Sequence, residues 1–201
     1  MRIVLVLALF ALAGDCEAQD VIIQRVELPP PTTFAGLKQL RGPLPSGPCT
    51  FPSVSLSVDS LSPIALGDSA ILLLPNGWRS SPLPNDDEYT TTRLAAPGDN
   101  RVWIERKRNG AVSRQFLRYG SGEQPVGTTC SLERGQTGAI WTFYPPDPRG
   151  TSGPRKYTAM GSIIRPAGFW YEVTLSTSSA TDQSQLASIL TEAMLLPSPK
   201  R

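Results

Sequence analysis

The chain has 201 residues and no histidine. Histidine is the usual general base near neutral pH and a common metal ligand. Its absence excludes Ser-His-Asp and Cys-His catalysis. A Ser-x-x-Lys arrangement is also missing, because the residues three positions before the four lysines are Ala35, Ile104, Gly153 and Pro197. We therefore expect a protein that is not an enzyme.

Motifs that would bind a phosphate or a metal are incomplete. The glycine-rich stretch 119–125 has Pro125 where the third glycine of G-x-G-x-x-G belongs. The acidic triplet at 86–88 lacks the alternating ligands and the glycine of a calcium loop. We expect no cofactor and no metal.

Long apolar runs are missing as well. The run from Ile3 to Ala13 is shorter than the about 20 residues that span a bilayer, and it follows Arg2, as in a secretory signal peptide. Cleavage after Ala13 or after Ala18 is open. The second site removes Cys16 and leaves an even number of cysteines in an exported chain.

The two remaining cysteines, Cys49 and Cys130, form the candidate disulfide of a periplasmic or secreted protein. A membrane-tethered lipoprotein modified at Cys16 stays an alternative. Lipidation needs a small residue directly before the modified cysteine, and Asp15 occupies that position here.

The net charge of +2 gives no reason to expect binding to nucleic acid. The most concentrated positive charge is Arg106, Lys107 and Arg108, which could meet an acidic partner or anionic lipid, or protect a sheet edge from pairing. Together with Trp170 and Glu172 they form the candidate partner surface. We expect an unknown protein partner and favour a membrane surface less.

Three segments follow from composition. Residues 1–18 are the signal peptide, 19–50 are a proline-rich arm or linker, and 51–196 form a single β-rich domain with a C-terminal helix. Strands are predicted at 53–59, 70–75, 138–144, 156–164 and 169–177. Asn109-Gly110 between two β-rich runs predicts a hairpin.

The stretch 168–190 changes its hydrophobic period from two to about 3.6. On the strand, Tyr171, Val173 and Leu175 share one face with Phe169, and Trp170 and Glu172 share the other. The helical face consists of Leu186, Ile189, Leu190, Ala193 and Met194. This pattern predicts an α+β fold, an antiparallel sandwich whose terminal amphipathic helix packs on the sheet.

Two carboxylates leave one catalytic alternative open. Glu105 and Glu172 both lie on predicted strands, and such a pair could cleave an extracytoplasmic glycan if the strands were neighbours. Surface glutamates with cross-strand partners are the other interpretation.

A strand-rich domain in which "LLLPNGW" precedes a meander, and "GFWYEVTLSTS" runs into a terminal helix, resembles the PsbP/Mog1-like α/β sandwich family over about residues 65 to 195. The resemblance implies a non-catalytic exported module that binds or steadies other proteins. We therefore expect a binding or assembly module, with the glycan hydrolase and the lipoprotein as alternatives.

Overall fold

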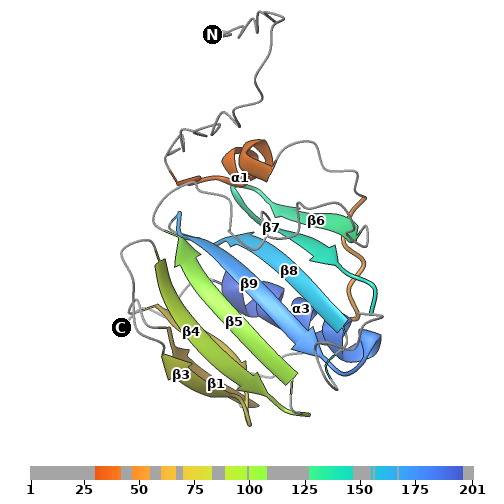
Figure 1. Cartoon of the computed structure of the whole chain (residues 1–201). Helices are drawn as coiled ribbons and strands as arrows, with labels where there is room; N and C mark the ends of the chain where they lie inside the picture. The colour runs from red at the N-terminus through yellow and green to blue at the C-terminus, as the bar shows by residue number, and fades with distance from the viewer. Residues whose placement is uncertain are drawn as a thin grey trace, which may run out of the picture.

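The computed structural model describes residues 30–41, 47–54, 60–66, 70–82, 89–98, 100–107, 127–146, 155, 157–166 and 168–196 (Figure 1). The elements in chain order are α1 (Phe34–Arg41), β1 (Leu61–Ala65), β2 (Ile71–Pro75), β3 (Arg79–Pro82), β4 (Tyr89–Ala96), β5 (Asn100–Lys107), β6 (Thr128–Arg134), β7 (Thr137–Phe143), β8 (Tyr157–Ile164), β9 (Trp170–Thr177) and α3 (Ala180–Leu195).

Seven strands form one antiparallel sheet in the order β3-β4-β5-β9-β8-β7-β6, and β1 and β2 form a separate antiparallel pair. Helix α3 lies behind the large sheet in Figure 1 and contacts β7, β8 and β9 as well as β2. The pair of β1 and β2 thus contacts α3 through β2. The predicted α+β sandwich with a C-terminal helix on the sheet is confirmed.

Helix α3 begins directly after Ser179, its N-cap. The Ser179 hydroxyl accepts a hydrogen bond from the Asp182 backbone N–H at 3.0 Å, which satisfies one of the free donors of the first turn. Its buried face packs on one face of β9. The shared core contains Tyr171, Val173, Leu175, Leu186, Leu190 and Met194, with Ile189 partly buried against it.

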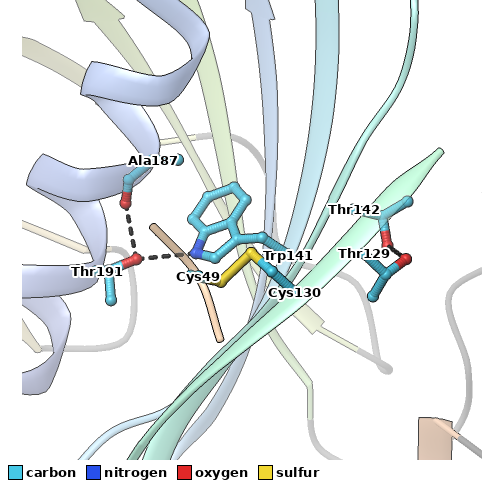
Figure 2. The surroundings of a disulfide bond; sticks show 7 residues. All are labelled: Cys49, Thr129, Cys130, Trp141, Thr142, Ala187 and Thr191. Carbon is cyan, nitrogen blue, oxygen red and sulfur yellow. Dashed lines mark hydrogen bonds between the residues drawn. A yellow bond between two sulfur atoms is a disulfide. The ribbon is translucent and has the colours of Figure 1, made fainter. Parts of the chain in front are cut away.

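A tryptophan fixes the helix against the sheet. The Trp141 indole N–H donates to Thr191 Oγ1 at 2.8 Å, and the Thr191 hydroxyl donates to the Ala187 carbonyl at 2.7 Å (Figure 2). The ring lies over Gly161, where an added Cβ would come within 2.8 Å of the indole. Gly161 therefore gives the indole the room that it needs to reach the helix.

The sequence does not predict α1, which lies within the segment expected to be an arm or linker. Its first turn is capped by Thr33, whose hydroxyl accepts from the Gly36 N–H at 3.2 Å. Phe34 and Leu37 are fully buried against Trp170 and its neighbours on the outer face of the sheet. Eight helical residues among prolines become stable because this apolar face is buried.

Two predicted β elements fall largely outside the described residues. Residues 53 and 54 of the strand predicted at 53–59 are irregular, and 55–59 lie outside the described residues. The Pro52 carbonyl just before them accepts from Ser188 of α3, so this backbone is bound to the helix and not to a strand. The hairpin predicted at Asn109-Gly110 also lies outside the described residues, and β5 before it pairs with β4 and β9.

Replacing Leu190 with Ala should lower the free energy of unfolding by about 2–5 kcal/mol, because the side chain is fully buried between α3 and the sheet. Urea denaturation at neutral pH measures the loss. Gln185→Ala, at an exposed position of the same helix, is the control and should change stability by less than about 0.5 kcal/mol. Equal stabilities for the two variants would contradict this packing.

Candidate functional site

A row of polar side chains crosses the outer face of the central strands. Glu105 of β5 lies directly opposite Glu172 of β9, and Glu172 lies opposite Ser162 of β8. Directly opposed residues share one face of a sheet. The two carboxylates that the sequence could not place on neighbouring strands are therefore neighbours.

One ammonium group joins the two carboxylates. Lys107 Nζ lies 2.8 Å from Glu105 Oε2 and 3.4 Å from Glu172 Oε2. Burial of Lys107 favours its neutral form, but the charge of Glu172 and the hydrogen bond to Glu105 outweigh that effect, so the pKa of the Lys107 ammonium is raised above its ordinary value. Lys107 is therefore charged at any physiological pH.

Three of the residues expected to form a partner surface are buried. Trp170 is 2% exposed and Glu172 is 4% exposed, and the Lys107 side chain is 8% exposed. Trp170 is covered by α1, a layer that the sequence did not predict, and Lys107 and Glu172 form an ion pair. Side chains covered in this way offer little surface to a partner, and the expected contact of these three residues stays a prediction.

Arg106, a further residue of that surface, is partly exposed. Arg108 lies outside the described residues. The Arg106 guanidinium lies over the Phe169 ring, with Cζ 4.2 Å from the ring centroid. Phe169 is 40% exposed. Because alternate residues of a strand point to opposite faces, the side chains of Arg106 and Lys107 lie on opposite faces of the sheet.

The sequence predicted Phe169 to share the core face of β9, and its exposure was missed. The residue lies just before β9 in a tight turn, where the Arg165 N–H donates to the Phe169 carbonyl at 2.8 Å. Gly168 within this turn has a φ of +76°. A Gly just before a strand is a turn signal, and it could have shown that Phe169 lies outside the packed part of the strand.

The geometry of the glutamates argues against acid–base catalysis. A glycosidase needs a protonated carboxyl group to donate to the leaving oxygen, and its two carboxyl groups flank the scissile bond. Here the Lys107 ammonium is bound to both carboxylates, in the place where the bond would lie. The arrangement connects β5 and β9 through the Lys107 ammonium.

The candidate disulfide is present. Cys49 and Cys130 are joined with an S–S distance of 2.06 Å, close to Trp141 and α3 (Figure 2). The Cys49 N–H donates to the Ser131 carbonyl at 2.9 Å, and the Ser131 N–H donates to Gly47 at 3.2 Å. The segment 47–49 therefore runs parallel to β6 along the edge of the sheet and is bonded to it covalently.

After Cys49 the chain contacts both β7 and α3. Phe51 packs against Phe143 of β7 with ring centroids 6.4 Å apart, and the Ser188 hydroxyl of α3 donates to the Pro52 carbonyl at 3.1 Å. Residues 47–52, which we call the strap, thus connect the edge strand β6 to the helix.

The described residues contain no group of three or more His, Cys, Asp or Glu that could hold a metal. In the same ranges, no helix is both long and apolar enough to cross a bilayer. The predicted signal peptide, the acidic triplet at 86–88 and the glycine-rich stretch at 119–125 lie outside the residues that the structure describes.

Substituting Lys107 with Met should destabilise the protein by about 3 kcal/mol at neutral pH, because two carboxylates then face each other without the Lys107 ammonium. A raised folded-state pKa means that this contribution is complete below the unfolded value of 10.5 and is lost as the pH rises through the folded value. The stability difference between wild type and Lys107→Met, from urea denaturation, should therefore shrink above pH 10.5.

Lys38→Met is the matched control, since Lys38 is paired with Glu133 at an exposed site. It should change stability by at most about 1 kcal/mol. A difference between wild type and Lys107→Met that stays constant across the alkaline range would contradict the role of the ammonium.

Replacing both Cys49 and Cys130 with Ser should cost about 4 kcal/mol of unfolding free energy, because the bond closes a loop with a sequence separation of 81. Denaturation of wild type with and without reductant, beside the double variant, measures the cost. Reduced wild type should match the variant. Equal midpoints for oxidised wild type and the variant would show that the strap does not need the bond.

No protein-family model matches the chain. No curated protein matches it either. What the protein does is therefore argued from the geometry described above.

Proposed function

We propose that the protein is an exported, non-catalytic binding or assembly module with the layout of the PsbP/Mog1-like family, and that it binds an acidic protein partner at Arg106 and Phe169. The observation that carries the proposal is the partly exposed aromatic ring with a guanidinium stacked on it. Aromatic residues and arginine are enriched at the centres of protein interfaces.

The stacked pair is suited to binding because it is ordered before a partner arrives. A guanidinium over an aromatic face loses little further conformational freedom on contact, and its positive charge complements an acidic partner. The tight turn at Arg165–Phe169 holds the ring in place. Preorganisation of this kind lowers the entropic cost of association.

Two further observations support export and a role without catalysis. The disulfide is of the kind that persists in oxidising compartments. The glutamates that could have served a hydrolase are both bound to Lys107. A terminal helix packed behind its preceding strand agrees with the layout of the proposed family.

The hydrolase remains as a second candidate because of one observation, the direct opposition of Glu105 and Glu172 in the sheet. It requires Lys107 to move away from both carboxylates. Turnover of a defined glycan by the purified, oxidised protein, lost in Glu105→Gln, would overturn the proposal of a non-catalytic module.

The partner surface is tested by placing the photo-crosslinker benzoylphenylalanine at position 169 in cells that produce the protein. We expect a discrete protein adduct that disappears when Arg106 is also replaced by Glu. The same crosslinker in place of Gln185, an exposed residue of α3, is the control and should give no such adduct. Identical adducts from both positions, or an adduct at 169 unaffected by Arg106→Glu in a folded protein, would refute the assignment.

A further inference from the structure

A second charged surface lies on the outer face of the sheet, at the end remote from α1. Arg79 of β3, Arg93 of β4 and Arg101 of β5 are all exposed, and Trp103 of β5 lies among them, partly exposed. We call this set the arginine face. In Figure 1 the strands β4 and β5 lie toward the viewer, with α3 behind the sheet.

The strand registers place these four residues on one face. Arg79 lies opposite Ala95, which lies opposite Arg101, and Arg93 lies opposite Trp103. Residues opposite each other across a sheet point the same way. Arg79 and Arg101 are thus two strand spacings apart, about 9.5 Å. Arg93 lies on the strand between them, two residues from Ala95, and is opposite Trp103.

The three guanidinium groups are not used by the fold. Among the described residues they have no ion pair and no side-chain hydrogen bond. Among the residues that the structure describes, the acidic side chain closest to them in the register is Glu105, two positions from Trp103, and its carboxylate is already bound to Lys107. The face therefore presents positive charge without a counter-charge from the described residues.

Hydroxyl groups continue the same rows. Thr174 lies opposite Trp103, Ser176 lies opposite Arg101, and Ser81 lies opposite Arg93. All three are at least partly exposed. A ligand that crosses the strands here would meet in turn guanidinium groups, an indole and hydroxyls, which can both donate and accept.

We propose that the arginine face binds an anionic polysaccharide whose sugars carry carboxylate groups. A guanidinium matches a carboxylate in two-point geometry, the hydroxyls match sugar hydroxyls, and an indole can pack against the apolar face of a sugar ring. The spacing between Arg79 and Arg101 suits alternate acidic sugars of an extended chain. The proposal concerns a different surface from Arg106 and Phe169 and stands independently of that partner.

Two other anionic partners fit less well. A membrane would be expected to meet apolar side chains that can insert, but the large exposed apolar residues among those described are Phe169 and Leu196, and neither belongs to β3, β4 or β5. An acidic peptide usually gains affinity by adding a strand to a sheet edge, whereas this surface is a sheet face whose central strands are paired on both sides.

The experiment titrates the full oxidised protein with polygalacturonate by calorimetry, at about 0.01 M and about 0.15 M salt, because screening distinguishes exposed charge contacts. We expect binding that weakens with salt. The double variant Arg93→Gln, Arg101→Gln should bind about tenfold more weakly. Lys38→Gln with Arg134→Gln removes the same charge from the other end of the sheet and should change affinity by less than about twofold.

Poly-L-glutamate and phosphatidylglycerol vesicles are titrated in parallel, and thermal unfolding checks that each variant is folded. The proposal is supported if the wild type binds poly-L-glutamate and the vesicles more weakly than polygalacturonate. It also requires that the Arg93 and Arg101 double variant alone loses affinity for polygalacturonate. Absence of polygalacturonate binding, equal loss in both double variants, or equal affinity for either parallel probe would overturn it.

Discussion

The structure depends on the alternation of side chains along β9. This strand lies at the centre of the seven-stranded sheet, and its odd-numbered residues from Tyr171 to Leu175 enter the core beneath α3. Its even-numbered neighbours Trp170 and Glu172 are buried on the opposite side. A shift of one residue would exchange the two sets, so burial on both faces fixes the register. Only two residues separate β9 from α3, which keeps the helix against the same strand.

The outer face of the sheet has three regions that differ in charge and in its compensation. Where α1 covers β7 and β8 the contacts are apolar, and at the centre Lys107 is buried only because two carboxylates compensate its charge. Over β3, β4 and β5 the arginines are in water and need no partner for the fold. The arginine face consists of residues that the fold does not use, and it is separate from the partner surface proposed at Arg106 and Phe169.

Local patterns predicted the last strand and helix well, because the periods of β9 and α3 and the Ser179 cap are set by residues close in sequence. The ion pair of Lys107 with Glu105 and Glu172 could not be predicted, since it depends on which strands are neighbours. Helix α1 was missed for a related reason. Its eight residues show a weak local signal, and burial of Phe34 against distant strands stabilises them. The opposition of Arg79, Ala95 and Arg101 is equally non-local.

The edges of the large sheet explain why both proposed contacts use side chains on faces and turns. At one edge, β3 is four residues long and ends in Pro82, which has no N–H to offer another strand. At the other edge, Ser131 of β6 already bonds to Gly47 and Cys49 of the strap, which the disulfide holds in place. Short, proline-ended or covered edges resist pairing with other chains. Both proposed contacts accordingly use guanidinium, aromatic and hydroxyl groups, whose contacts depend on charge and shape, in place of the backbone of an added strand.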